Sequence, residues 1–149
     1  MIKLLRTDSG HHDFVDLVKL LDAELALRDG EDHAFYDQYN SINQIKFAVV
    51  AFENDQPTGC GAIKEITKEA MEVKMMYVKP QARSRGLATL ILRELESWAK
   101  ELGYTACVLE TGKKQPEAIG LYQKNGYVQI PNYGQYLGIE NSLCFEKKL

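Results

Sequence analysis

The sequence is poor in cysteine, and the few it has are not arranged as pairs. Cys60, Cys107 and Cys144 are the only cysteines among 149 residues; they lie far apart and no C-x-x-C pair occurs. An odd number of separated thiols in apolar stretches argues against a disulfide framework. We expect reduced core thiols in a cytosolic protein, with a redox or nucleophilic cysteine as the less favoured alternative.

Long apolar runs and a strong excess of one charge are also missing. No stretch reaches the roughly 18 apolar residues of a membrane-spanning helix, and the N-terminus lacks a signal-peptide pattern. The net charge is only −3, which gives no electrostatic basis for binding nucleic acid or an acidic membrane. With 45% hydrophobic and 26% charged residues, the chain suits one globular domain over residues 1–149, in the cytoplasm.

Apolar periodicity predicts alternating strands and helices. The predicted strands are 2–6, 45–52, 58–66, 71–78, 105–110, 127–130 and 143–148. The predicted helices follow a turn at 7–10, occupy 87–102, and run from Gln115-Pro116 to Asn125-Gly126. The strands between 45 and 78 are joined by short loops and must be antiparallel, whereas 105–110 follows a crossover helix and should pair in parallel with 71–78. This order predicts an α/β fold with a mixed sheet.

Residues 28–43 show no clean period. Asp29-Gly30 ends the preceding helix, and aromatic and polar residues follow, including His33, Tyr36, Tyr39 and Asn40. The segment is either a substrate-facing stretch or a short solvated helix. The adjacent His11 and His12 start a helix and are interpreted as surface residues, and no metal-ligand spacing is apparent.

The segment Val78 to Ala88 reads V-K-P-Q-A-R-S-R-G-L-A, between a buried strand and an amphipathic helix. The first turn of a helix has unpaired backbone N–H groups and a partial positive charge, which suit a phosphate. Gly86 and Ala88 let a bulky anion approach the backbone, while Arg83 and Arg85 add donors. The pattern predicts a pyrophosphate site, although such a turn alone is often only a solvated cap.

Two motifs resemble the GNAT (GCN-related) N-acetyltransferase superfamily. Arg83, Gly86 and Ala88 fill the defined positions of its Q/R-x-x-G-x-G/A loop. The segment 118–127, A-I-G-L-Y-Q-K-N-G-Y, resembles its A-x-x-L-Y-x-x-x-G-F/Y segment. The element order matches along nearly the whole chain. One departure is Gln115, where many members have asparagine.

This resemblance implies a GNAT-type fold with six to seven strands and flanking helices. It also implies transfer of an acetyl group from acetyl-CoA to a primary amine of a small molecule, amino acid or peptide, by direct attack in a ternary complex. Dimers are common in the family, so a homodimer is compatible with the sequence. The alternative function is a catalytically silent acyl-CoA-binding or sensor module.

The resemblance also assigns cofactor contacts. The donor would lie between the strands at 71–78 and 105–110, with its pantetheine arm on a strand backbone and on the Gln115 amide. The expected cofactor-binding residues are Met76, Tyr77, Val78, Arg83, Ser84, Arg85, Gly86, Leu87, Ala88, Gln115 and Tyr122.

Tyr122 is the expected partner of the departing thiolate, as the matching tyrosine is in the family. A thiol pKa of about 8.5 against about 10 for tyrosine makes full proton transfer uphill by roughly 2 kcal/mol. Hydrogen bonding to the sulfur is therefore at least as important as proton transfer. The alternative for Tyr122 is a tyrosine packed in the core.

The attacking amine needs a base, because deprotonating an alkyl amine at pH 7 costs roughly 4.6 kcal/mol. Glu72 stands eleven residues before Arg83, where some members carry a glutamate base. Burial or a water relay would have to assist it, and an exposed strand glutamate is the alternative. Glu65, Glu110 and His33 are weaker candidates.

The acceptor side is expected to include Asp29, His33, Tyr36, Tyr39, Tyr133 and Tyr136. Their mixture of acids and aromatics suits a cationic amine, although aromatic loop residues are just as often packing residues.

Overall fold

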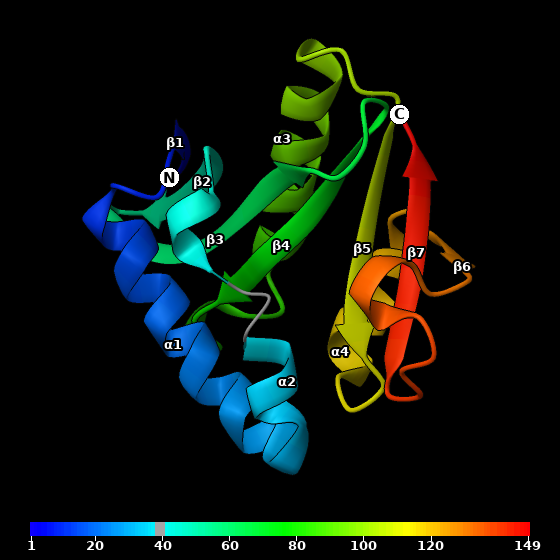
Figure 1. Ribbon diagram of the computed structural model, residues 1–149. Coiled ribbons are helices and arrows are strands. Elements are labelled where there is room, and N and C mark those ends of the chain that lie inside the picture. Colours follow the sequence, from blue (N-terminus) through cyan, green and yellow to red (C-terminus); the bar gives the residue numbers. More distant parts are fainter. Residues whose placement is uncertain (38–40) are drawn as a thin grey trace.

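The computed structural model describes residues 1–37 and 41–149 (Figure 1). Tyr39 and Asn40 of the expected acceptor segment lie outside these residues. The strands are β1 (Ile2–Thr7), β2 (Phe47–Glu53), β3 (Gln56–Glu65), β4 (Ala70–Val78), β5 (Ala106–Gly112), β6 (Val128–Ile130) and β7 (Ser142–Lys148). The helices are α1 (His12–Asp29), α2 (His33–Asp37), α3 (Leu87–Glu101) and α4 (Pro116–Lys124). Short 3₁₀ turns are η1 (Gly30–Asp32), η2 (Ile42–Gln44), η3 (Pro80–Ala82) and η4 (Gly134–Tyr136).

The strands form one seven-stranded mixed sheet in the order β1-β2-β3-β4-β5-β7-β6. All neighbouring pairs are antiparallel except β4 and β5, which are parallel. This confirms the predicted α/β class, the antiparallel strands between 45 and 78, and the parallel pairing across the crossover helix.

The sheet separates two apolar cores. Along β2, Ala48 and Val50 belong to the core that contains Phe14 of α1, whereas Val49 and Ala51 belong to the core that contains Ile91 of α3. Successive side chains of a strand point to opposite faces, so alternate residues serve the two helices. Figure 1 shows α1 and α3 running on either side of the central strands.

Helix α3 packs closely against β3 because glycine leaves room for it. A Cβ on Gly61 would lie 2.6 Å from Met76 Sδ and 2.8 Å from Leu95 Cδ1. A side chain at Gly61 would therefore have to displace the side chains of Met76 and Leu95. Since α3 carries the predicted phosphate turn at its N-terminus, this contact helps to position the site.

Several element ends differ from the sequence prediction by one or two residues, and two of them have a clear local cause. Asn54 and Asp55 form a two-residue turn with φ values of 51° and 67°, so β3 begins at Gln56 and the loop is shorter than predicted. Helix α1 is capped by His11, whose Nδ1 accepts a hydrogen bond from the Asp13 N–H at 3.2 Å. Histidine is not among the usual cap residues, which is why the sequence did not indicate it.

Strands β4 and β5 separate after a short parallel contact. Their paired residues are Ala70–Ala106, Met71–Cys107 and Glu72–Val108. Beyond this point β5 stays paired with β7 as far as Gly112, and β4 runs on beside β3. Figure 1 shows the two strands diverging toward α2 and α4. Among the residues that the structure describes, the facing edges of β4 and β5 therefore have no strand partner there.

Within the described ranges, no helix has the length and apolar character needed to cross a membrane. All three cysteines are buried and free, as predicted.

Candidate active site

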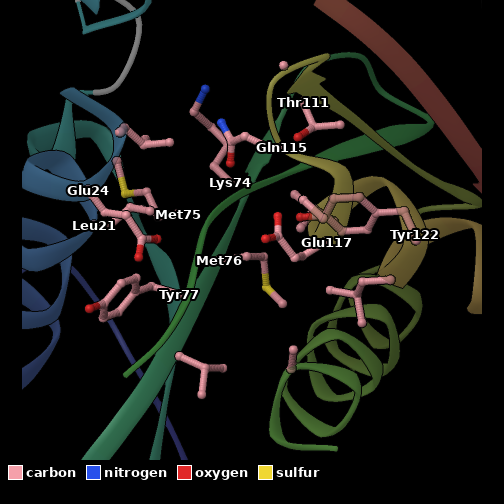
Figure 2. Close-up of a pocket in the computed structure, with 18 of the residues that line it drawn as sticks. Leu21, Glu24, Lys74, Met75, Met76, Tyr77, Thr111, Gln115, Glu117 and Tyr122 are labelled. Atoms are coloured by element: carbon pink, nitrogen blue, oxygen red, sulfur yellow. The ribbon is translucent and has the colours of Figure 1, made fainter. Parts of the chain in front are cut away.

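A cleft occupies the space where β4 and β5 diverge. It has a volume of about 590 Å³ and is bounded by α1, β4, the start of α3, the end of β5, and α4. Figure 2 shows β4 with Met75, Met76 and Tyr77 on one side and α4 with Tyr122 on the other. A cleft of this size is typical of a small-molecule site.

Strand β4 offers its backbone to the cleft. Met76, Tyr77 and Val78, which we expect to bind the cofactor, line the cleft along the edge that β5 does not cover. Met75 has φ 57°, a conformation that is uncommon for residues with a side chain, and the β3–β4 register shifts here. This irregularity bends the strand at the site, and the apolar sequence of β4 gave no sign of it.

The turn between β4 and α3 presents backbone donors. Gly86 is the N-cap of α3 with φ 81°; no side chain caps the helix, and no acidic residue lies in its first turn. A Cβ on Gly86 would meet no atom within 4 Å. The first N–H groups of α3 thus have no side-chain cap among the described residues, and Gly86 leaves space beside them, an arrangement that suits a phosphate group. Ser84, Leu87 and Ala88 also line the cleft.

The two arginines of this turn hold it in shape. Arg83 Nε donates to Val78 O at 2.8 Å, and its Nη2 lies 2.9 Å from Glu24 Oε1 of α1. Arg85 forms a two-bond ion pair with Glu53 at 2.7 and 2.8 Å and does not line the cleft. Both guanidinium groups are thus engaged with carboxylates, and the backbone is left as the main source of donors.

Tyr122 lies in the wall of the cleft formed by α4. Its side chain is buried, and its ring makes an edge contact with Tyr127 at 5.7 Å between centroids. Burial and the nearby Glu110 carboxylate raise the pKa of Tyr122 above its usual value. The phenol therefore stays protonated at neutral pH. Gln115, the N-cap of α4, lines the same wall.

Glu72 lies where β4 and β5 part, and both its carboxylate oxygens have partners. Lys74 Nζ lies 3.2 Å from Oε1, and the Tyr133 hydroxyl donates to Oε2. Glu65, a weaker candidate for the base, does not line the cleft and accepts a hydrogen bond from Tyr104.

Glu110 is differently placed. It lies near the end of β5 and lines the cleft. Its Oε2 is buried without a hydrogen-bond partner among the described residues. Burial raises the pKa of Glu110 to about 7, while the Ser142 hydroxyl and the Lys74 charge act in the opposite direction.

The expected acceptor residues divide into two groups. Asp29, Tyr36 and Tyr136 line the cleft, whereas His33 and Tyr133 do not. Burial raises the pKa of Asp29. Sequence reasoning missed several lining residues: Leu21, Glu24, Leu25 and Arg28 of α1, Lys74 of β4, Thr111 of β5 and Glu117 of α4. The α1 residues carry no motif, because their helix was assigned only by its buried face.

One group of possible metal ligands lies away from the cleft. The ligand atoms of His11, His12 and Asp13 lie within 4.8 Å of one another at the start of α1. His11 Nδ1 serves there as the helix cap.

The comparisons with known proteins agree with this geometry. A profile described as the "Acetyltransferase (GNAT) family" matches residues 14–127, which is most of the chain. The chain belongs to the GNAT acetyltransferase family. The resemblance inferred from the two motifs is thereby confirmed, and with it the enzyme class and acetyl-CoA as acyl donor.

Relatives of this GNAT chain match from two thirds to nine tenths of its length. An IAA acetyltransferase of Azospirillum brasilense is 36% identical over 138 residues, which are 91% of this chain and 90% of the relative. An uncharacterized N-acetyltransferase of Bacillus subtilis is 32% identical over 101 residues, 66% of this chain and 67% of that one.

Solved structures confirm the fold. A protein of Klebsiella pneumoniae, described as an acyl-CoA N-acyltransferase, has a TM-score of 0.84 and 27% identity, and the match covers 100% of this chain and 98% of that one. The PaiA N-acetyltransferase of Thermoplasma acidophilum, solved with coenzyme A, has a TM-score of 0.74 at 18% identity and covers 100% and 99%. The second likeness concerns the fold alone.

Proposed function

We propose that this GNAT enzyme transfers the acetyl group of acetyl-CoA to a primary amine of a small molecule, amino acid or peptide, by direct attack in a ternary complex. The observation that carries the proposal is the continuous cleft from the first turn of α3, along the uncovered edge of β4, to Tyr122. The order of the groups along it matches the order of parts in acetyl-CoA: pyrophosphate, pantetheine and thioester.

The donor end is built from backbone. The first turn of α3 would hold the pyrophosphate with its free N–H groups, and Gly86 leaves space for it. Along the edge of β4, Met76 to Val78 would hydrogen-bond the pantetheine amides as a neighbouring strand would. Gln115 faces this edge from α4 and would bind a pantetheine amide with its side chain (Figure 2).

Tyr122 would stabilise the departing sulfur. Its raised pKa keeps the hydroxyl protonated, so the group is a hydrogen-bond donor at neutral pH. Its burial excludes water from the same place, which strengthens the interaction with a developing negative charge.

The acceptor end favours a cationic amine. Asp29, Glu72 and Glu110 bring three carboxyl groups to this end of the cleft, where the Lys74 ammonium is paired with Glu72. Tyr36 and Tyr136 add aromatic surface there. An amine that carries a positive charge would gain from both features. A cytosolic location is part of the proposal and is supported by the free, buried cysteines.

The test is thiol release from acetyl-CoA with a panel of alkyl amines, for wild type, Tyr122→Phe and Tyr127→Phe. Both variants lose a buried phenol hydroxyl, but Tyr127 hydrogen-bonds Glu96 outside the cleft. We expect Tyr122→Phe to lower kcat about 10- to 100-fold with unchanged CoA affinity. Tyr127→Phe should lose stability and keep its kcat.

Two results would contradict the proposal. Equal kcat for wild type and Tyr122→Phe would remove the role of the hydroxyl. Calorimetric CoA binding without turnover of any amine would favour a catalytically silent acyl-CoA-binding or sensor module.

A further inference from the structure

Glu110 has a carboxylate oxygen that the protein itself leaves without a hydrogen bond among the described residues. This oxygen, Oε2, is buried, although the side chain lines the cleft. The competing carboxylate, Glu72, already accepts from Lys74 and Tyr133. An unpartnered carboxylate oxygen can accept a proton from a ligand without first breaking an internal bond.

A chain of hydroxyl groups leads from Glu110 to Tyr36. The Ser142 hydroxyl interacts with the Glu110 carboxylate, and its Oγ lies 2.9 Å from the Tyr36 hydroxyl. A hydroxyl group both donates and accepts, so it can pass a proton on without becoming charged. Once Glu110 is protonated, its O–H donates to Ser142 while Ser142 donates to Tyr36, which is the orientation in which a proton leaves Glu110.

Tyr36 lies between two hollows. It lines the cleft, and it also lines a second hollow of about 340 Å³ formed with η1, α2 and the turn before β7. Asp32 and Glu140 lie in this second hollow. Its walls include none of the residues that we assign to the donor or to Tyr122.

We propose that Glu110 takes the proton of the acceptor amine and that Ser142 and Tyr36 pass this proton to the second hollow. The inference rests on the proposed acetyl transfer and assigns its base. It gives the proton an exit when donor and acceptor together fill the cleft.

The protons and electrons balance in four movements. The alkylammonium group gives one proton to the Glu110 carboxylate and becomes a neutral amine. The nitrogen lone pair forms the bond to the acetyl carbon, and the pair of the C–S bond leaves with the sulfur. The nitrogen loses its second proton, which ends on the sulfur beside Tyr122. The first proton leaves Glu110 through the two hydroxyl groups, so one proton is released per turnover.

The groups around Glu110 come from every element that packs near it. They are Asp29 of α1, Tyr36 of α2, Glu72 and Lys74 of β4, Tyr122 of α4, Tyr136 of η4, and Ser142 and Cys144 of β7. The nearby acids Asp29 and Glu72 raise the pKa of Glu110, and Lys74 lowers it. The carboxylate form is therefore present mainly above pH 7, where it can act as a base.

The first experiment measures kcat/KM against pH for alkyl amines. Wild type should lose activity below an apparent pKa near 7. In Glu110→Gln, kcat/KM at pH 7 should fall about 100-fold, and the decline of kcat/KM below pH 7 (the acidic limb of the profile) should disappear. Glu110→Asp should keep this limb with a lower kcat/KM. An arylamine is already neutral at pH 7, so its acetylation should lose far less in Glu110→Gln. A limb near pH 7 that survives in Glu110→Gln, or equal losses for both amine classes, would overturn the inference.

The second experiment tests the hydroxyl chain. Ser142→Ala should move the limb to higher pH, because it removes a donor to the Glu110 carboxylate. Tyr36→Phe should lower kcat several-fold, and small buffer bases such as imidazole should restore part of the rate. A Tyr36→Phe rate that imidazole leaves unchanged would restrict Tyr36 to packing and overturn the relay.

A third measurement needs no turnover. Carboxyl-carbon NMR of the protein should show Glu110 titrating near pH 7. Titration at its ordinary value of about 4.3 would overturn the inference. Wild type that turns over amines while Glu110→Gln is unaffected would contradict this inference alone, whereas CoA binding with no turnover of any amine would also contradict the proposed function.

Discussion

Two glutamates a few residues from the strand junction have opposite environments. Glu72 is buried with an ammonium and a hydroxyl at its oxygens, whereas Glu110 is half-buried and its buried Oε2 has no hydrogen-bond partner among the described residues. Burial disfavours the charged form of a carboxyl group, and hydrogen-bond donors or cations beside it offset this cost. The difference decides which of the two carboxylates is available to a substrate.

This difference predicts an effect on stability. The raised pKa of Glu110 means that the folded chain holds more protons than the unfolded chain between pH 4.5 and 7. The free energy of unfolding should therefore fall as pH rises through this window. Glu110→Gln removes the titration, so its stability relative to wild type should increase by up to about 3 kcal/mol between pH 5 and pH 8. Urea denaturation at both pH values measures this.

The control for this prediction is Glu69→Gln, a change at an exposed position in the turn before β4. Its unfolding free energy should follow wild type across the same range. Parallel pH dependence of wild type and Glu110→Gln would show that burial does not raise the pKa of Glu110.

For individual site residues, the sequence motifs were more informative than the apolar periodicity. The A-x-x-L-Y pattern brought out Tyr122, which the structure places in the cleft wall. Strand periodicity could not rank Glu72 against Glu110, because the partners Lys74, Tyr133 and Ser142 come from β4 and from segments more than 30 residues away. A side chain's partners depend on the tertiary fold, which local patterns do not contain.

Among the elements, α3 has a glycine with positive φ at each end. Gly86 caps its start with φ 81°, and Gly103 follows its end with φ 97°; a Cβ on either would meet no atom within 4 Å. An alanine would therefore meet a similar backbone strain at the two positions and would have free space for its methyl group at both. They differ in place, because only Gly86 lines the cleft.

This pair gives a matched test of the phosphate turn. Gly86→Ala and Gly103→Ala should each cost about 1–2 kcal/mol of stability, because alanine is strained in this conformation. Only Gly86→Ala should weaken CoA binding, by an expected 5- to 50-fold, since the turn must reshape to relieve the strain. Urea denaturation and calorimetry measure the two quantities. Equal CoA affinity in both variants would mean that the turn does not hold the pyrophosphate.

Element boundaries were predicted where a single residue dictates them. Gly30 ends α1 and Pro116 begins α4, as the sequence indicated. The bend at Met75 and the tight turn at Asn54-Asp55 were not predicted. Methionine has no preference for positive φ, so that bend is imposed by the packing of β3 and β4 rather than by local sequence.

Over the whole molecule, the cleft divides the sheet into two parts with little direct contact. Three residue pairs join β4 to β5, and Glu96 of α3 accepts hydrogen bonds from Tyr127 and Lys147 at 2.9 Å each. A molecule that binds both facing edges would add contacts between the two parts. The parallel β4–β5 order was predictable from the crossover helix, but the extent of pairing was not.

Coenzyme A should therefore stabilise the whole chain. At a concentration of 100 times Kd it should add about 2.7 kcal/mol and raise Tm by roughly 5–10 °C. Hydrogen exchange should slow at residues 73–78 of β4 and in the first turn of α3. Amides of β1 provide the control and should respond much less. Uniform protection, or none on β4, would contradict binding along its edge.

The contact of Tyr133 with Glu72 at the point of divergence has a consequence for selectivity. It ties the loop after β6 to β4 at the apex of the wedge, and the buried Lys74 ammonium neutralises the same carboxylate. These two contacts restrain β4 and the loop after β6 where the two strands begin to diverge. An enzyme whose cleft is restrained in this way should select acceptors by their width. It should acetylate unbranched alkyl amines faster than amines branched at the carbon next to the reacting nitrogen.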